Sequence, residues 1–302
     1  MRLAAIDLGS NAIRLLICEV GLYTDGSLDI TKLNLIRVPL RLGFDVFENK
    51  RISDQKKADL IETMKSYKHL LKVYNVQRFR ACATSAMRDA ENAQDIIDQV
   101  KQETGITIEV ITGNEEARII YETHLAETLN ASGNYLYIDV GGGSTELSYY
   151  SKGKLLQNQS FNIGTIRMLK NKDESETWDA VRDFLKAQVK SNGKCLAIGS
   201  GGNINKLFSM SKRKNGKPLD IDFLKSMYKE MNAMTVSERI HQYGFKEDRA
   251  DVIVPALQVY IQVMTWGGIK EIHVPQIGLA DGLIHKLYEE SSFSSLIGLN
   301  RS

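Results

Sequence analysis

A short pattern that occurs twice constrains the fold of this chain more than any other feature of its sequence. In the first copy, an apolar run ends at Asp7, a turn of small residues follows at Gly9 to Asn11, and a second apolar run begins. In the second copy, the apolar run ends at Asp139 and the turn is the glycine-rich segment Gly141 to Ser144. Each copy is typical of two β-strands joined by a turn whose backbone N–H groups can bind phosphate.

The spacing of the two copies predicts the domain organisation. They lie about one domain length apart, which indicates two related α/β lobes that each bring one hairpin to a shared cleft. We expect a first domain at residues 1–128 and a second at residues 129–279, with the short polar segment at residues 130–134 as the crossover. A final helix at residues 280–302 is expected to pack back on the first domain.

Composition narrows the class of protein without naming a partner. The 302 residues are 43% hydrophobic and 25% charged with a formal net charge of +2, values that are ordinary for a globular protein. This balance does not indicate a nucleic-acid or membrane partner, and no apolar run approaches the roughly 18 residues of a membrane span. Cys18, Cys82 and Cys195 lie in apolar runs. We interpret them as small core residues in a reducing environment and expect a cytoplasmic location.

Two segments of the first half carry candidate charged groups. A strand at residues 78–83 leads into a small polar loop at residues 84–90 that opens a helix, and helix N-termini attract anions. Arg88 in this loop could make a bidentate contact to a phosphate, or could be a surface arginine. Farther on, a strand at residues 106–112 precedes a helix that begins near Glu115 and Glu116. Glutamates in a first helical turn usually stabilise the helix dipole, by about 0.3 to 1 kcal/mol each.

Other segments leave alternatives open. Residues 42–45 are expected to form a loop, and Arg167 could line the cleft or be solvated. A third glycine loop at residues 199–203 ends a strand and precedes a helix, where glycine permits close packing or close approach of a ligand. The basic cluster at residues 212–217 could be a solvated loop or a track for a long polyanion. Pro255 predicts a helix start or a kink.

These segments resemble the exopolyphosphatase and guanosine pentaphosphate phosphohydrolase family, which belongs to the superfamily of sugar kinases, actin and heat-shock ATPases. The resemblance runs from the first strand to the last helix. It implies two ribonuclease-H-like, actin-like ATPase lobes around an interdomain cleft, without the C-terminal accessory helical domain of larger relatives. The chain departs from the family at Ala280, where an arginine is common.

The resemblance also implies roles for individual residues. In this family the glutamate directly before Ala-Arg activates the attacking water, a position that corresponds to Glu116. We expect Asp139 and Glu146 to complete the catalytic group and to bind Mg²⁺ with their hard oxygen atoms, while Asp7 joins them or orders its own loop. The candidate phosphate-binding residues are Gly9, Ser10, Asn11, Arg14, Ser85, Arg88, Gly141, Gly142, Gly143, Ser144, Thr145, Gly201 and Gly202.

The sequence thus predicts an exopolyphosphatase that releases terminal orthophosphate from inorganic polyphosphate with Mg²⁺ as cofactor. Guanosine pentaphosphate 5′-phosphohydrolase is the alternative within the family, since it needs the same anhydride chemistry. A sugar kinase and a regulator that binds polyphosphate or nucleotide without catalysis are alternatives from other classes. The expected partner is the polyphosphate or guanosine pentaphosphate substrate, with no nucleic acid and no membrane, and the prediction allows for a homodimer.

Overall fold

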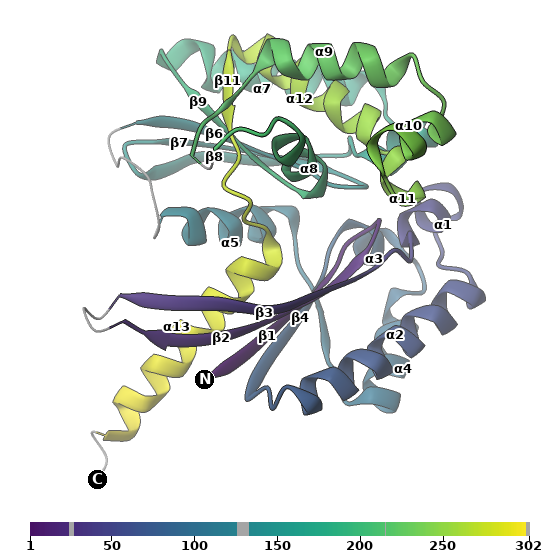
Figure 1. The fold of residues 1–302 in the computed structure, drawn as a ribbon, viewed down its shortest axis with the longest axis vertical. Coiled ribbons are helices and arrows are strands. Elements are labelled where there is room, and N and C mark those ends of the chain that lie inside the picture. The colour runs from purple at the N-terminus through teal and green to yellow at the C-terminus, as the bar shows by residue number, and fades with distance from the viewer. Residues whose placement is uncertain (24–26, 126–132, 215, 300–302) are drawn as a thin grey trace. The chain divides into compact units, whose positions relative to one another are not determined.

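The computed structural model describes residues 1–23, 27–125, 133–214 and 216–299 (Figure 1). The chain divides into two compact units. Unit 1 comprises Met1–Thr112 together with Leu279–Ser302, and unit 2 comprises Gly113–Gly278. The predicted crossover at residues 130–134 lies largely outside the described residues, as does the predicted domain boundary between residues 128 and 129.

Unit 1 is built on a five-stranded mixed sheet with the strand order β3-β2-β1-β4-β5. Its strands are β1 (Arg2–Leu8), β2 (Ile13–Leu22), β3 (Leu28–Val38), β4 (Arg78–Ala83) and β5 (Ile108–Val110). The strands β1, β2 and β3 form an antiparallel meander, and β4 and β5 continue the sheet parallel to β1. Its helices are α1 (Leu42–Asn49), α2 (Asp54–Val73), α3 (Ser85–Asp89), α4 (Ala93–Thr104) and α13 (Leu279–Leu299).

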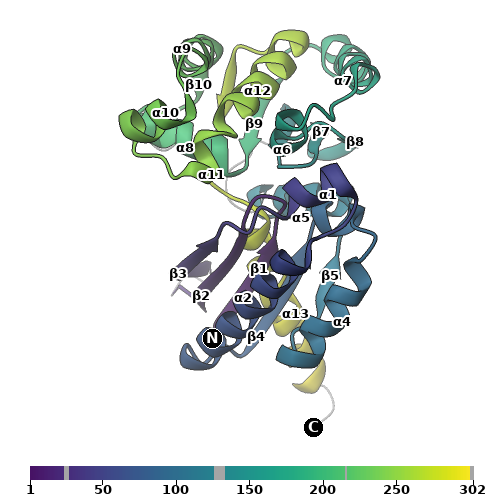
Figure 2. The same ribbon diagram turned by 90° about the vertical axis from the view of Figure 1, so that its right-hand side faces the viewer.

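Helices cover both faces of this sheet. Figure 2 shows α2 and α4 on one side of the strands and α13 on the other, where α13 contacts β1, β2 and β4. Accordingly, consecutive residues of β1 from Leu3 to Ile6 are all buried with 0% exposure. A strand that alternates apolar and polar residues would suit a sheet with one solvated face, whereas a continuous apolar run suits a strand covered on both faces.

Unit 2 contains a six-stranded sheet with the order β10-β11-β9-β6-β7-β8. Its strands are β6 (Asn134–Val140), β7 (Thr145–Ser151), β8 (Lys154–Phe161), β9 (Leu196–Ser200), β10 (Leu219–Asp220) and β11 (Glu271–His273). Its helices are α5 (Gly113–Leu125), α6 (Thr165–Leu169), α7 (Ser175–Gln188), α8 (Gly202–Met210), α9 (Ile221–Asn232), α10 (Val236–Tyr243), α11 (Glu247–Ala250) and α12 (Ile253–Gly267), with a 3₁₀ turn at Lys190–Asn192. The apolar α12 lies in the core of this unit.

The two sheets share one topology. Beginning at the edge strand that follows each hairpin, the strand order is β3-β2-β1-β4-β5 in unit 1 and β8-β7-β6-β9-β11 in unit 2. The first three strands of each series are antiparallel. The predicted α/β fold of two ribonuclease-H-like lobes is therefore confirmed. The repeat found in the sequence corresponds to the β1–β2 hairpin in unit 1 and the β6–β7 hairpin in unit 2.

Local structure differs from the sequence predictions at several points. Residues 42–45, predicted as a loop, are the first turn of α1, and the strand predicted at residues 106–112 is shortened to Ile108–Val110. Helix α5, which the prediction gave to the first domain, packs on β7 and β8 and is part of unit 2. Pro255 is the third residue of α12, so it marks a helix start and not a kink.

The remaining global predictions concern the cysteines and the membrane. All three thiols are buried, and burial raises the pKa of Cys18 and of Cys195 to about 12, as suits core residues. Across the described ranges, no helix combines the length and the apolar character that a membrane span requires.

Candidate functional site

The two hairpins place their functional side chains by the same strand register. Asp7 at the end of β1 pairs with Arg14 on β2, and Asp139 at the end of β6 pairs with Glu146 on β7. Directly opposed residues of an antiparallel pair point to the same face, with Cβ atoms about 4.5 to 5.5 Å apart. Unit 1 therefore presents an acid beside a base, and unit 2 presents two acids side by side.

The Asp7–Arg14 pair is an ion pair within unit 1. Arg14 Nη1 donates to Asp7 Oδ2 at 2.7 Å, and Asp7 is only 5% exposed. The sequence left open whether Asp7 would join the metal ligands or order its own loop. This contact gives Asp7 a partner within its own hairpin, which favours the ordering role.

Hydroxyl groups hold the carboxylate of Glu146 in place. Ser144 Oγ donates to Glu146 Oε1 at 2.7 Å, and Ser160 Oγ on β8 donates to the same oxygen at 2.8 Å. Ser160 is the register partner of Glu146 on the third strand, so Asp139, Glu146 and Ser160 lie in one row across the sheet. Glu146 is 3% exposed. Charge-assisted bonds of this kind are worth about 1.5 to 3 kcal/mol each, so this carboxylate is firmly oriented.

Helix α5 begins directly against this row. A Cβ atom added to Gly113 would lie 2.8 Å from Glu146 Oε1 and 2.8 Å from Ser160 Cβ, so a larger residue would force the carboxylate or the helix to shift. Glu116 follows three residues later, and residues three apart lie on the same side of a helix. The fold thus brings Glu116 into the same unit as Asp139 and Glu146, one helical turn beyond the contact with Glu146. Glu115 points about 100° away from it.

The glycine loop of unit 2 has its carbonyl oxygens occupied by helix α6. Thr165 N donates to Gly141 O at 3.0 Å, and Ile166 N donates to Gly142 O at 2.8 Å. Arg167 adds a bond from its Nε to Gly143 O at 2.8 Å. Arg167 is 7% exposed, so it is a buried support of the loop, where the sequence had suggested a residue that lines the cleft or is solvated.

In the described chain, the N–H groups of the same loop, unlike its carbonyls, make no hydrogen bonds to helix α6. Gly141 N closes the turn onto Ser144 O at 2.9 Å. Within the part of the chain that the structure describes, the N–H groups of Gly142, Gly143 and Ser144 have no hydrogen-bond acceptor. Thr145, 1% exposed, uses its hydroxyl to bond Ile163 O at 2.6 Å and so anchors the start of β7. Consecutive backbone donors without acceptors form a concavity that suits an anion.

The loop of unit 1 is held in an equivalent way. Gly9 N closes the turn onto Ala12 O at 3.2 Å, and the carbonyls of Ser10 and Asn11 accept from Gly43 N at 2.9 Å and Arg41 N at 3.0 Å. These two donors lie at the start of α1, the helix after the third strand, as α6 does in unit 2. This is the physical reason why residues 42–45 are helical. The first turn of α1 docks on the hairpin loop.

The segment after β4 joins the unit 1 loop through side chains. Ser10 Oγ and Ser85 Oγ share a hydrogen bond of 2.8 Å, and both residues are buried. Arg88, on the short helix α3, donates from Nη1 to Ile111 O at 2.9 Å, which ties this helix to the end of β5. The structure therefore brings Gly9, Ser10, Ser85 and the Asp7–Arg14 pair together at one end of the sheet.

The third glycine loop lies beside Asp139 within unit 2. Ser200 at the end of β9 is the register partner of Asp139, and Gly201 has φ 109°, a conformation that favours glycine. Tyr260 is fully buried and donates to Ser200 O at 2.5 Å. Burial, reinforced by the charge of Asp139, raises the pKa of Tyr260 well above its ordinary value, so the phenol stays protonated. Arg249 Nη1 donates to Gly202 O at 2.8 Å.

The donor set of unit 2 fits a hard divalent cation that keeps part of its water shell. Two adjacent carboxylates repel one another unless a cation lies between them. Across the described ranges, no cluster of three or more His, Cys, Asp or Glu side chains is arranged to hold a metal ion. Mg²⁺ is commonly bound by one or two carboxylates together with water and substrate phosphates. Asp139 and Glu146 meet that requirement.

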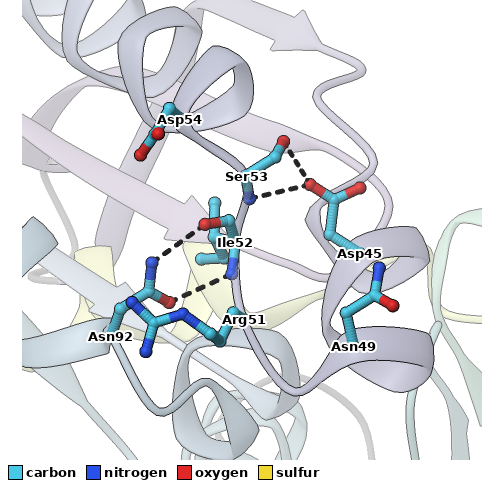
Figure 3. A pocket seen from close by; sticks show the side chains of 7 residues that line it. All are labelled: Asp45, Asn49, Arg51, Ile52, Ser53, Asp54 and Asn92. Carbon is cyan, nitrogen blue, oxygen red and sulfur yellow. Dashed lines mark hydrogen bonds between the residues drawn. The ribbon is translucent and has the colours of Figure 1, made fainter.

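A cavity of about 260 Å³ in unit 1 contains none of the predicted site residues. Figure 3 shows that it lies where the α1–α2 connection meets Asn92, whose side-chain amide bonds both backbone groups of Ile52. Asp45 accepts from the backbone N–H and the hydroxyl of Ser53 and forms an ion pair with Lys56 at 2.8 Å. Burial acts to raise the pKa of Asp45, but these bonds outweigh it and the pKa is lowered. These contacts serve the junction of the two helices.

The basic cluster at residues 212–217 is exposed at each described position. Arg213 pairs with Asp220 and with Pro218 O. Of the sequence alternatives, a solvated loop accounts for these observations.

Sequence reasoning missed several residues that shape the site. These are Gly113, Ser160 and Tyr260. They act through contacts between segments that are distant in the chain, and their residue types are common. One signal was available. Ser160 falls on the strand next to Glu146, so pairing the three predicted strands in register would have aligned the two residues.

Comparison with known proteins identifies the family. The model of the Ppx/GppA phosphatase family matches residues 23–291. Exopolyphosphatase 1 of Mycobacterium tuberculosis is 26% identical over 318 aligned positions, which cover 98% of this chain and 91% of that protein. Guanosine-5′-triphosphate,3′-diphosphate pyrophosphatase of Vibrio campbellii is 27% identical over 300 positions, which cover 95% of this chain and 59% of that protein.

Solved structures agree with this assignment. The Aquifex aeolicus member of the Ppx/GppA family is 27% identical and superposes with a TM-score of 0.73, covering 96% of this chain and 98% of that one. An exopolyphosphatase from Cytophaga hutchinsonii, at 24% identity, shares the fold with a TM-score of 0.81 over 96% of this chain and 98% of that one. The chain therefore belongs to the Ppx/GppA phosphatase family.

Proposed function

We propose that this protein is an exopolyphosphatase that hydrolyses the terminal phosphoanhydride bond of inorganic polyphosphate. The observation that carries the proposal is the glycine loop of unit 2. Its carbonyls are occupied by α6, its N–H groups at Gly142 to Ser144 lack acceptors among the described residues, and it lies between the paired acids Asp139 and Glu146. Phosphate binding, metal binding and charge neutralisation are the main requirements of phosphoryl transfer.

In the proposed reaction, the N–H groups of the unit 2 loop bind phosphate oxygens. Within unit 1, the loop at Gly9 to Asn11 with Ser85, Arg14 and Arg88 is a second set of candidate phosphate contacts. Asp139 and Glu146 would hold Mg²⁺, whose charge would offset that of the phosphate oxygens. Glu116 accepts a proton from water as the water oxygen attacks the terminal phosphorus. The bond between that phosphorus and the bridging oxygen breaks, and the shortened chain leaves with the bridging oxygen. Gly201, which lies beside Asp139, and Gly202 are further candidate phosphate contacts in this assignment.

The first test measures orthophosphate release by the purified protein with polyphosphate and guanosine pentaphosphate side by side, with and without Mg²⁺. The proposal expects release from polyphosphate that depends on Mg²⁺ and needs no acceptor alcohol. Faster release from guanosine pentaphosphate would favour the alternative activity of the family, whose Vibrio campbellii relative matches most of this chain. Binding of polyphosphate without hydrolysis would favour the non-catalytic regulator, and a requirement for a sugar acceptor would favour a kinase.

The second test addresses Glu116. Glu116→Gln keeps the size of the side chain and removes the base, so turnover is expected to fall by about 10² to 10⁴ with the substrate affinity retained. Glu115→Gln is the matched control because it makes the same change one position earlier in the same helical turn, on another side of α5. Equal rates for Glu116→Gln and the wild type would remove Glu116 from the mechanism.

A further inference from the structure

The turn at Ser200 to Gly202 lies beside the carboxylate of Asp139. Ser200 pairs in register with Asp139 on the neighbouring parallel strand. A Cβ atom added to Gly201 would lie 3.2 Å from Asp139 Oδ1 and 3.2 Å from Val140 O. The backbone of the turn therefore forms one wall around this carboxylate, and a shift of the turn would change the space in which Asp139 can lie.

Two side chains from one region of the chain fix the turn. Tyr260 on α12 donates its hydroxyl to Ser200 O at 2.5 Å, and Arg249 on α11 donates to Gly202 O at 2.8 Å. The two acceptors flank Gly201, and a Cβ atom at Gly201 would lie 3.8 Å from the Tyr260 hydroxyl. The carbonyls on both sides of Gly201 are thus held by donors that come from elsewhere in unit 2.

We propose that Tyr260, with Arg249, is a positioning residue for the reaction, which holds the Ser200–Gly202 turn against Asp139 and so fixes the orientation of that carboxylate. The inference rests on the proposed function, because that function gives Asp139 its role at the reacting phosphate. A misplacement of about 1 Å in a site of this kind can cost up to 10² in rate. The hydroxyl of Tyr260 lies in the core of unit 2 and donates to Ser200 O, with the backbone of Val140 and the charge of Asp139 also near it, and its proposed effect on Asp139 is through the turn.

The chain offers a matched control for the loss of a buried hydroxyl. Tyr149 on β7 belongs to the same core cluster as Tyr260, and both are 0% exposed. The hydroxyl of Tyr149 has no hydrogen-bond partner among the described residues. Tyr149→Phe and Tyr260→Phe therefore remove the same atom from the same core, and only the second change leaves a carbonyl without its donor.

The experiment compares the wild type, Tyr260→Phe and Tyr149→Phe in the full-length protein. Tyr260→Phe is expected to lower kcat for orthophosphate release by about 10-fold with KM changed by less than about threefold, because the lost contact acts on the reacting group. Backbone amide hydrogen exchange at residues 201–203 is expected to become at least about 10-fold faster, since the turn opens more readily. Tyr149→Phe is expected to change neither quantity.

Equal kcat and equal amide exchange in Tyr260→Phe and the wild type would overturn the inference, as would the same changes in Tyr149→Phe. If the wild type releases no orthophosphate from either substrate, the proposed function fails by itself. Amide exchange then decides whether Tyr260 holds the turn. Arg249→Met removes the second contact and provides an independent variant. Faster exchange at residues 201–203 in Arg249→Met supports the inference, and unchanged exchange contradicts it.

Discussion

At the scale of single residues, the two hairpins differ chemically at one position. The residue seven places after the strand-ending aspartate is Arg14 in unit 1 and Glu146 in unit 2. In unit 1 the aspartate is neutralised by its own hairpin at 2.7 Å. In unit 2 two carboxylates lie side by side, which is costly without a cation. One substitution between the copies therefore separates an ion pair from a candidate metal site.

Gly113→Ala tests the contact between α5 and Glu146. The new Cβ atom would lie 2.8 Å from Glu146 Oε1 and from Ser160 Cβ, so the carboxylate or the helix must shift. We expect turnover to fall by about 10- to 100-fold by misplacement of Glu146 and Glu116. The cost in stability is expected to be about 1 to 3 kcal/mol, as for other overpacked cores.

Orthophosphate release and urea unfolding would check this prediction. Gly21→Ala is the control, because a Cβ atom at Gly21 meets nothing within 4 Å. Turnover of Gly113→Ala equal to that of Gly21→Ala would show that the close contact does not position the catalytic groups.

At the scale of secondary structure elements, a helix after the third strand supports each glycine loop. Helix α1 donates N–H groups to the carbonyls of Ser10 and Asn11, and α6 does so to Gly141 and Gly142. Occupied carbonyls cannot rotate toward a bound anion, so the loop keeps its N–H groups available for phosphate. Preorganised donors of this kind cost no reorganisation at the moment of reaction.

Gly164→Ala tests this support in unit 2. Gly164 precedes α6, and a Cβ atom there would lie 2.5 Å from the carbonyl carbon and oxygen of Gly142 and 2.5 Å from the carbonyl carbon of Gly143. Backbone atoms cannot move aside as a flexible side chain can, so the helix must separate from the loop. We expect a stability loss of about 1 to 3 kcal/mol, and a shift in Tm of about 2 to 4 °C for each kcal/mol in a unit of this size.

Calorimetry and polyphosphate binding would measure the effect. Gly267→Ala is a suitable comparison in the same unit, because its Cβ atom would meet only side-chain atoms, at 3.3 Å and beyond. Polyphosphate affinity of Gly164→Ala equal to that of Gly267→Ala would contradict a role of α6 in preparing the loop for phosphate.

At the scale of the whole molecule, unit 1 is discontinuous in sequence and unit 2 is continuous. Helix α13 contributes buried side chains to unit 1, namely Leu279, Ala280, Leu283, Ile284 and Leu287. Burial of a large aliphatic side chain is worth about 1.5 to 3 kcal/mol. Four of these five are large, so α13 contributes about 6 to 12 kcal/mol, comparable to the whole stability of a domain of about 5 to 15 kcal/mol.

Removal of residues 279–302 is therefore expected to unfold unit 1 and to leave unit 2 folded on its own core. Limited proteolysis with mass spectrometry should then yield a resistant fragment close to residues 113–278. A chain that ends after Ser291 retains all five buried residues and should resist proteolysis throughout both units. Protection of residues 1–112 from proteolysis in the chain that lacks residues 279–302 would contradict the assignment of α13 to the core of unit 1.

The sequence by itself determined the repeat, the α/β class and the positions of the two hairpin loops. These features depend on residues that are neighbours in the chain. An apolar run predicts a strand, an Asp at its end supplies the carboxylate, and glycines allow the turn. Asp139 and Glu146 could be paired in advance because a hairpin with a short turn has a fixed register. Roles such as that of Glu116 came from the resemblance to a family, and they stay predictions.

The tertiary structure decided which segments meet. The partner of Ser200 O is Tyr260, sixty residues away, and the partner of the Gly141–Gly143 carbonyls is a helix whose first turn has no sequence marker beyond Gly164. Likewise, the need for glycine at position 113 comes from the close approach of Glu146 on β7 and Ser160 on β8. Such contacts depend on packing between elements distant in sequence, which local propensity does not encode, whereas the strand, turn and carboxylate of each hairpin are neighbours in the chain.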